Sequence, residues 1–411
     1  MDTSDVVLTE SASAFDVVII GAGPAGLCFA SSLRDLGLRI ALVERLKQAA
    51  VAEPPYDGRE IALTLKSVDL LKALGVWDRI PASAIATLQG ARVLNGDSLQ
   101  ALNLRPPATG SPDIGYLVSN SEIRRAAYEN LRGASGITLH TECEVVSLSA
   151  SPGGSAVELS DGRCLTARLV VAADSRYSQS RRTRGIPAQM TDFGKSMLVC
   201  RMNHSIPGDR VAWEWFGHRQ TLALLPISEH CASVVLTLPH DQIRRLMMQE
   251  PTAFGTEIAV RFHNRLGTMS LASERYEYPL VAVYARRFCA ERYAVIGDAA
   301  VGMHPVTAHG FNFGLLGQDT LARLIRTAVA GDCDIADPAL LSTYDRAHRR
   351  ATLPLYLATN AIVRLYTADS PPTRFARHAL LGAARRVRPF GALLTALLTH
   401  RSRSLPVRPG H

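Results

Sequence analysis

The sequence predicts an α/β protein in which a doubly wound domain is interrupted by an inserted antiparallel sheet and followed by C-terminal helices. Three observations predict this fold. An apolar strand near the N-terminus runs directly into a glycine-rich turn and a helix. A second glycine-rich stretch follows another apolar run far along the chain. Between them, segments rich in β-branched residues outnumber helical patterns.

The N-terminal element is a strand, turn, helix and strand in succession. Phe15–Ile20 is short, apolar and rich in β-branched residues, which is typical of a buried parallel strand. Gly21–Gly26 reads Gly-Ala-Gly-Pro-Ala-Gly. Apolar residues then recur at helical spacing from Leu27 until Gly37, which ends the helix. Arg39–Glu44 forms the next strand and ends in an acid, as dinucleotide-binding units do.

Each residue of this unit has a physical function in binding a dinucleotide. Gly21 permits the tight turn, Gly23 lets the backbone approach a pyrophosphate, and Gly26 lets the helix pack against the strand. The N-terminus of the helix offers free N–H groups and a positive dipole to phosphates. Glu44, 23 residues after Gly21, is placed to bind ribose hydroxyls. NAD and FAD both satisfy this pattern.

The late glycine-rich stretch favours FAD. Tyr293–Gly297 is predicted to return as another strand of the same sheet, with Asp298 at its carboxyl end, where ligands of such sheets bind. Asp298 can bind the hydroxyls of the ribityl chain, which FAD has and NAD lacks. A helix from Gly310 to about Val329 would direct its N-terminal amides toward the pyrimidine edge of a flavin.

These motifs resemble those of the single-component flavoprotein aromatic hydroxylases of the para-hydroxybenzoate hydroxylase type, and more narrowly the ubiquinone-biosynthesis hydroxylases. The resemblance runs from about Asp16 to about Tyr366. Besides the two stretches above it rests on Gly58–Thr64, in which the family's Arg contacts FAD, and on Leu169–Ser178, in which the family's Asp lies near the flavin. The resemblance therefore implies an FAD-binding domain with an inserted substrate domain.

The expected cofactor-binding residues all belong to these four motifs or follow them directly: Gly21, Gly23, Ala25, Gly26, Glu44, Arg45, Arg59, Asp174, Asp298, Gly310, Phe311 and Asn312. His304, Pro305 and His309 are the candidate catalytic residues because they would lie beside the flavin. The alternative is that both histidines only hydrogen bond to loop carbonyls. No metal site is expected, because no metal-ligand spacing occurs.

The chain departs from the family pattern at several positions. Ser175 stands where the family usually has Gly. Val301 replaces a usual His, and Thr307–Gly310 replaces a usual small-Gly-Gln-Gly. These departures leave the FAD motifs intact and affect the substrate pocket. The HPVTAHGFN version favours the demethoxyubiquinol hydroxylase branch.

The resemblance also implies the reaction. NADPH or NADH would reduce FAD, oxygen would add at the flavin C4a carbon, and the distal oxygen would pass to an electron-rich phenol ring. The absence of a second GxGxxG fits a nicotinamide that binds only transiently. The expected substrate is a polyprenylated quinol or phenol. A hydroxylase of soluble phenols, or a non-catalytic protein that binds FAD and lipid, remain the alternatives.

The predicted organisation divides the chain into six segments. The FAD-binding domain takes 12–84, 113–183 and 281–330; the substrate domain takes strands from 85–112 and an antiparallel sheet over 184–280; C-terminal helices and a basic tail fill 331–411. Trp213 and Trp215 lie on one face of a strand in this sheet, either packing or lining the pocket. They are not followed by the Ile-Pro of the flavin halogenase motif.

Net charge and cysteine content limit the classes of partner and the cell compartment that we expect. The net charge is +8, and residues 371–411 carry eight Arg and no acid, so the rest of the chain is near neutral and no nucleic-acid binding is expected. The Arg residues flank an apolar helix that can lie on an anionic membrane, contact quinone-pathway proteins, or pack on the body. Seven Cys without CxxC spacing fit reduced thiols, so the expected location is the cytoplasm or the inner face of its membrane.

Overall fold

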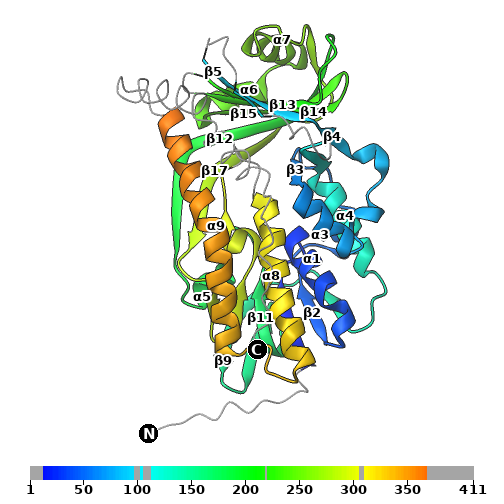
Figure 1. Ribbon diagram of the computed structural model, residues 1–411, viewed down its shortest axis with the longest axis vertical. Helices are drawn as coiled ribbons and strands as arrows, with labels where there is room; N and C mark the ends of the chain where they lie inside the picture. The colour runs from blue at the N-terminus through cyan, green and yellow to red at the C-terminus, as the bar shows by residue number, and fades with distance from the viewer. Residues whose placement is uncertain (1–12, 97–101, 105–112, 218–219, 305–309, 368–411) are drawn as a thin grey trace, which may run out of the picture.

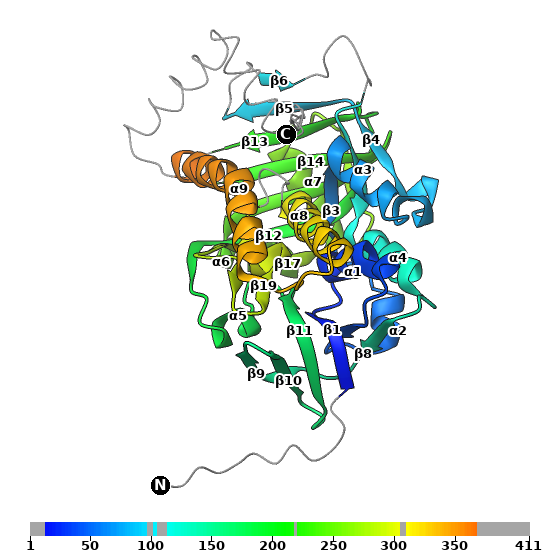
Figure 2. The same ribbon diagram turned by 60° about the horizontal axis from the view of Figure 1, so that its bottom comes forward.

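A computed structural model describes residues 13–96, 102–104, 113–217, 220–304 and 310–367. The predicted fold class is confirmed: a doubly wound α/β domain carries an inserted sheet (Figure 1). The eight-stranded sheet lies at one end of the molecule and the nine-stranded sheet at the other, with the N-terminal end of α8 (Gly310–Ala330) directed toward the second (Figures 1 and 2). The cofactor site is therefore expected between the two sheets.

The eight-stranded sheet forms around β1 (Ser13–Ile20), whose last four residues are buried. Its path is β18 (Cys289–Ala290), β19 (Tyr293–Val295), β11 (Cys164–Ala172), β1, β2 (Ile40–Val43) and β8 (Ile137–His140), with β10 (Gly154–Leu159) and β9 (Val145–Ser151) attached to β11. The central pairs, from β19 through β8, are parallel. β19 thus comes from late in the chain and joins this sheet beside β11, as predicted. Asp298 therefore lies near the carboxyl ends of its parallel strands.

Helices cover this sheet and connect its strands. α1 (Pro24–Leu33) ends in a 3₁₀ turn (Arg34–Leu36) at Gly37, whose φ of 69° allows the turn to close. α8 packs against both α1 and α9 (Pro338–Thr367). The remaining helices are α2 (Gln48–Ala52), α3 (Leu65–Ala73), α4 (Asn120–Leu131), α5 (Gln179–Thr183), α6 (His240–Met248) and α7 (Pro251–Arg261), and short 3₁₀ turns span Trp77–Arg79, Ala82–Ala84 and Gly297–Ala299 (η4).

The inserted sheet has nine strands. Its path is β20 (Val301–Gly302), β17 (Tyr276–Ala285), β12 (Ala188–His204), β15 (Cys231–Pro239), β14 (Thr221–Ser228), β13 (Val211–Phe216), β5 (Gly90–Asn95) and β6 (Leu102–Leu104), and β16 (Met269–Leu271) pairs with β12. The pairs are antiparallel except β13 with β5, which run parallel. The sheet is therefore mixed at this pair.

A three-stranded sheet lies between the larger ones and contains β3 (Glu60–Thr64), β7 (Gly115–Ser119) and β4 (Ala86–Leu88). β4 falls in the segment 85–112 that was expected to extend the inserted sheet. It pairs instead with β7, with Ala86 opposite Leu117, so only β5 and β6 of that segment join the nine-stranded sheet.

One face of the nine-stranded sheet is covered by α6 and α7 (Figure 1). Trp213 and Trp215 are 8% and 4% exposed and pack in the same cluster as Phe254 and Ile258 of α7. Both Trp side chains therefore belong to the core under these helices. The opposite face is directed toward β3 and the N-terminal end of α8.

α9 closes the other side of the FAD-binding region. Tyr344 Oη donates a hydrogen bond to the carbonyl oxygen of Val295 at 2.7 Å, and Asp345 Oδ1 accepts from the Phe288 amide at 2.6 Å. The predicted apolar helix and Arg-rich tail beyond Thr367 lie outside the described residues. Within the described part of the chain, no helix is long and apolar enough to cross a membrane.

Candidate active site

The glycines of the turn after β1 differ in why a side chain is excluded: two are required by packing within the protein, and one leaves space for a ligand. A Cβ on Gly26 would lie 2.0 Å from the carbonyl oxygen of Gly21, and a Cβ on Gly21 would lie 2.7 Å from that of Ala173. A Cβ on Gly23 would have no protein atom within 4 Å. Gly23 has ordinary extended backbone angles, so the fold does not require glycine there. Open space at this position fits the close approach of a bound group.

The N-terminus of α1 faces the same space. No side chain caps it and no acid lies in its first turn. Its free N–H groups and dipole are therefore left available for an anion, as pyrophosphate binding requires. Glu44, at the end of β2, accepts the Ala22 amide at 2.8 Å through Oε2 and the Leu46 amide at 3.0 Å through Oε1. Glu44 thus fixes the glycine turn, and the neighbouring Arg45 is exposed.

The two glycine-rich stretches meet at the start of α1 and α8. A Cβ on Gly297 would lie 2.9 Å from the Ala25 Cβ, and a Cβ on Gly314 would lie 4.0 Å from it. Ala25 therefore packs at the junction of the two motifs. Asp298, in η4 after β19, is 35% exposed and forms an ion pair of 3.0 Å with Arg176. Gly310 opens α8 next to this carboxylate: a Cβ there would lie 4.0 Å from Asp298 Oδ1.

Asn312 holds α8 to β3. Its Oδ1 accepts the Thr64 amide at 3.0 Å, and its Nδ2 donates to the Ala62 carbonyl at 2.9 Å. The Asn312 side chain is 3% exposed and its amide is engaged with the β3 backbone, so any contact with a cofactor there falls to main-chain atoms. Phe311 is half-buried and packs against the main core.

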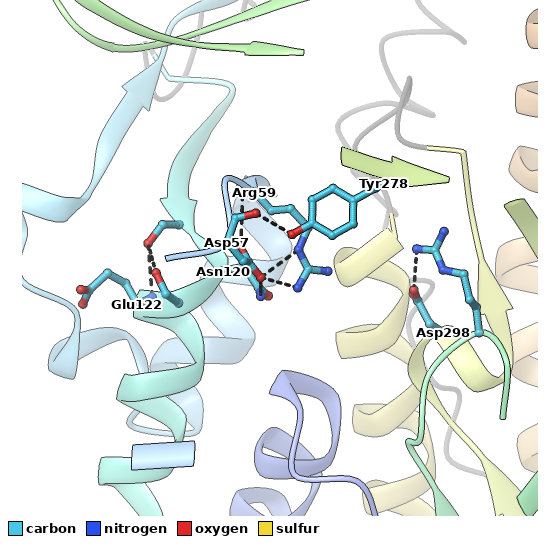
Figure 3. Close-up of polar contacts among 9 residues, drawn as sticks. Asp57, Arg59, Asn120, Glu122, Tyr278 and Asp298 are labelled. Atoms are coloured by element: carbon cyan, nitrogen blue, oxygen red, sulfur yellow. Dashed lines mark hydrogen bonds and ion pairs between the residues drawn. The ribbon is translucent and has the colours of Figure 1, made fainter. Parts of the chain in front are cut away.

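Arg59 lies in a polar cluster directly before β3. Asp57 Oδ2 accepts hydrogen bonds from Arg59 Nε at 3.0 Å and from Asn120 Nδ2 at 2.8 Å. Tyr278 donates its hydroxyl to the Asp57 carbonyl and places its ring 5.5 Å from the Arg59 guanidinium (Figure 3). Burial works against the charge of Arg59, but Asp57 outweighs it, so the pKa of Arg59 is raised. The 40% exposed guanidinium remains charged for a ligand.

Sequence reasoning missed three residues of this region: Asp57, Arg124 and Arg176. Arg124 of α4 is half-buried; burial lowers its pKa, while Asp57 and Glu44 act in the opposite direction. It is thus a second cation between the Arg59 cluster and the acid of β2. Asp57 could have been found from its spacing, because Asp57 Oδ1 accepts the amide of Arg59 two residues later. Nothing local singles out Arg124, which the α4 fold brings here.

Asp174 is directed into the protein. Its Oδ2 accepts both the amide (3.2 Å) and the hydroxyl (2.8 Å) of Ser180 at the start of α5, and Ser180 Oγ lies 2.9 Å from Tyr293 Oη. The Asp174 carboxylate therefore orders the loop after β11. In the same loop Ser175 has a φ of 83°, the left-handed region that glycine adopts freely, where the family pattern has Gly.

His304 is the one candidate catalytic residue within the described range. It is 5% exposed, and its ring meets Phe193 edge-on with centroids 5.0 Å apart. Burial, aided by Lys195, lowers the pKa of His304 to about 3. The uncharged form of His304 is therefore favoured near neutral pH. Pro305 and His309 lie outside the described residues.

The site fits FAD in its donor set. Open space at Gly23, an uncapped α1, a half-exposed Asp298 and two cations from separate elements match the phosphates and hydroxyls of an extended dinucleotide. Among the residues that the structure describes, no group of three His, Cys, Asp or Glu could hold a metal ion.

Comparison with known proteins decides the family. The model of the FAD binding domain family matches residues 14–354. The chain belongs to this family. It is a flavin-dependent monooxygenase that binds FAD. Ubiquinone hydroxylase UbiM of Neisseria meningitidis is 43% identical over 388 residues, covering 93% of this chain and 84% of the relative.

Two more distant relatives have related names. Ubiquinone hydroxylase UbiL of Rhodospirillum rubrum is 32% identical, covering 92% of this chain and 88% of the relative. The 3-demethoxyubiquinol 3-hydroxylase of Escherichia coli is 28% identical, covering 90% and 95%. The identity to the demethoxyubiquinol enzyme is thus lower than to UbiM.

Solved structures support the fold. p-Nitrophenol 4-monooxygenase PnpA of Pseudomonas putida superposes with a TM-score of 0.77 at 17% identity, covering 95% of this chain and 100% of that one. PqsL of Pseudomonas aeruginosa, a probable FAD-dependent monooxygenase, gives a TM-score of 0.73 at 20% identity, covering 89% and 99%. At these identities the likeness concerns the fold alone.

Proposed function

We propose that this protein hydroxylates the aromatic ring of a ubiquinone precursor, using O₂ and NADPH or NADH. The observation that carries the proposal is the 43% identity to a ubiquinone hydroxylase over 93% of the chain. The branch follows the same comparison: UbiM is favoured over the demethoxyubiquinol enzyme at 28%. Quinone precursors carry long apolar chains, which gives the Arg-rich C-terminal segment a role at an anionic membrane surface.

The chain's own residues bind and orient the cofactor. The amides at the start of α1 hold the pyrophosphate, with Gly23 allowing close approach. Glu44 accepts from the ribose hydroxyls, and Asp298 from the ribityl hydroxyls, its charge balanced by Arg176. Arg59 and Arg124 add positive charge beside them. FAD, when bound and reduced by the nicotinamide, supplies the activated oxygen.

Other parts of the site would stabilise charge on the flavin and exclude water from the reacting groups. The amides at the start of α8 stabilise negative charge on the flavin ring. His304, uncharged near neutral pH, adds a polar group without adding a positive charge. The face of the nine-stranded sheet opposite α6 and α7 is directed toward this site, where it would cover a bound flavin ring and keep water out. His309 and Pro305 remain candidates for contact with the substrate.

The test is a mass-spectrometric one. Purified protein with FAD, NAD(P)H and O₂ is incubated with quinone lipids extracted from cells that lack the gene. We expect a precursor to gain one oxygen atom in its head group. If the lipids stay unchanged while soluble phenols are hydroxylated, the substrate class is wrong. If NAD(P)H is not oxidised with any ring compound, the protein does not turn over and the enzymatic proposal fails.

A further inference from the structure

Glu214 lies on the face of the nine-stranded sheet that is directed toward the cofactor site. Its neighbours Trp213 and Trp215 pack under α6 and α7, and side chains alternate along a strand, so Glu214 points to the opposite face. The sheet register confirms this. Glu214 is opposite Ala223, Ala223 opposite Val235, and Val235 opposite Val199, which places all four on one face.

This face is the one that contacts the FAD-binding region. Two residues beyond Val199 on β12, Arg201 points the same way and pairs with Glu60 of β3 at 2.6 Å. Tyr278, opposite Met197 of the same face, donates its hydroxyl to the carbonyl of Asp57. Glu214 lies three strands away from Val199, about 14 Å at ordinary strand spacing.

The surroundings of Glu214 are apolar but not fully covered. Three apolar residues lie beside Glu214 on the same face of the sheet, and each keeps some accessible surface: Val93 on β5, Ala223 on β14 and Val235 on β15. The adjacent residues on these strands point to the other face and are buried beneath the helices: Leu94, Leu224 and Val234. A partly accessible apolar band therefore crosses four adjacent strands of a sheet face that is turned into the molecule. Such a band fits an aromatic ring with an apolar chain.

Glu214 is the acid of this band, and it has no hydrogen-bond or ion-pair partner among the described residues. Glu60 of β3, which meets this face, is paired with Arg201 of β12, so both of these charged groups are engaged. Surrounding protein desolvates the Glu214 carboxyl and raises its pKa well above the usual range. Glu214 as a whole residue is half-buried, like its neighbours in the band, so it keeps surface that a ligand can contact.

We propose that Glu214 is a substrate-binding residue whose carboxyl hydrogen bonds to a ring oxygen of the aromatic substrate and so sets the orientation of the ring. The inference rests on the proposed function and adds a substrate class to it. In its protonated form the carboxyl donates to a hydroxyl or methoxy oxygen and accepts from a hydroxyl. A ring that bears a carboxylate is disfavoured, because the described residues of this band, Val93, Glu214, Ala223 and Val235, include no cation that could neutralise a desolvated charge.

The experiment compares three variants of the holoenzyme. Glu214→Leu removes the hydrogen bond, and Glu214→Gln keeps its shape and its capacity to donate and accept. Glu229→Gln changes an exposed acid in the β14–β15 turn and serves as the control. The probes are a 2-methoxyphenol with a six-carbon alkyl chain and the matched ring with a carboxylate in place of the methoxy group. Binding is followed by the flavin absorbance, and turnover by NAD(P)H oxidation, hydroxylated product and H₂O₂.

We expect Glu214→Leu to weaken methoxyphenol binding about tenfold, the loss of one hydrogen bond, with normal FAD content and more H₂O₂ per product. Glu214→Gln should bind within a few-fold of wild type and lose the fall in activity that ionisation of Glu214 causes at high pH, a change that a merely structural role would not produce. Glu229→Gln should match wild type. The carboxylated ring should bind wild type least.

Two results overturn the inference in different ways. If the methoxyphenol binds wild type and Glu214→Leu equally, with equal coupling, Glu214 does not contact the substrate, and the proposed function stands. If no oxygenated ring perturbs the flavin of wild type at all, the proposed function fails and takes this inference with it.

Discussion

At the scale of single residues, Ser175 occupies a backbone conformation that suits glycine. Its φ is 83° and its side chain is exposed, so replacing it loses no buried contact. We expect Ser175→Gly to stabilise the protein by up to about 1 kcal/mol, since left-handed conformations cost L-residues about that much and glycine's greater freedom when unfolded offsets part of the gain. Thermal unfolding measures it. Ser228→Gly, at an exposed position without positive φ, should not stabilise; equal gains at both sites would contradict the strain argument.

The buried, uncharged ring of His304 leads to a second prediction at this scale, on how the stability of the protein depends on pH. Its pKa is about 3 in the folded protein against 6.5 for an ordinary histidine, so the unfolded chain binds a proton between these values and the native state does not. Stability is then complete above about pH 6.5 and falls as the pH drops toward 3, by up to about 1.4 kcal/mol per pH unit. The unfolding midpoint of His304→Gln should fall less between pH 7 and pH 5 than that of wild type. Buried His348, whose pKa is lowered to about 4, makes the same contribution to the loss of stability at low pH in both proteins, so the comparison isolates His304.

The polar residues of the site differ in how far the sequence could predict them. Glu44 and Asp298 follow strands that the apolar pattern reveals, so their positions could be predicted. The engagement of Asn312 with β3 and of Asp174 with α5 could not, because their partners are backbone groups of other elements. Glu214 could not be recognised either, since only the strand register separates its face from that of the two Trp residues.

At the scale of elements, the turn from β1 to α1 allows binding and folding to be tested separately. Gly23→Ala places a methyl group in open space, and we expect it to leave the stability of the cofactor-free protein unchanged while lowering FAD affinity at least tenfold. Gly26→Ala drives its Cβ against the carbonyl of Gly21 and should lower both. FAD fluorescence titration and thermal unfolding of the cofactor-free proteins measure the two effects. Normal FAD affinity in Gly23→Ala would mean that no group approaches the backbone there.

Element pairing was only partly predictable from local pattern. The apolar pattern of the sequence predicts strands β1 and β19 and helix α8, and the structure has these elements at the predicted positions. The parallel pairing of β5 with β13, and the loss of β4 to the three-stranded sheet, depend on which strand edges are free once the chain has folded. Short runs such as Ala86–Leu88 carry no information on their partner.

At the scale of the whole molecule, the charge distribution gives a prediction for membrane contact. The body is near neutral and residues 371–411 supply eight Arg. Each Arg near an anionic surface contributes about 1 kcal/mol, and salt screens the attraction. We expect the full chain to sediment with vesicles containing anionic lipid at low salt, and less at high salt. A variant with these Arg residues changed to Gln should stay in solution with full FAD content; equal sedimentation would assign any binding to another surface.

The fold alone does not choose the chemistry. The chain superposes on a flavin-dependent halogenase, CmlS, with a TM-score of 0.72, close to the value for PqsL. What separates the chemistries is local: the strand motif Trp213–Phe216 lacks the Ile-Pro of halogenases, and its carboxylate faces an apolar band. Similarity of the whole molecule at these identities thus concerns the fold alone, and the choice of chemistry depends on single side chains.

The sheet order has a consequence for how the protein is made. β19 lies beside β11, and α8 packs on α1, so the cofactor site joins Gly21 to Asn312. A ribosome adding about 5–20 residues per second needs roughly 15–60 s to pass from one to the other. Between Ala172 and Tyr293, roughly 6–24 s of that interval, the apolar edge of β11 has no partner strand because β19 is not yet synthesised. Newly made chains should therefore depend on chaperones until translation is almost finished, and should acquire FAD only after release.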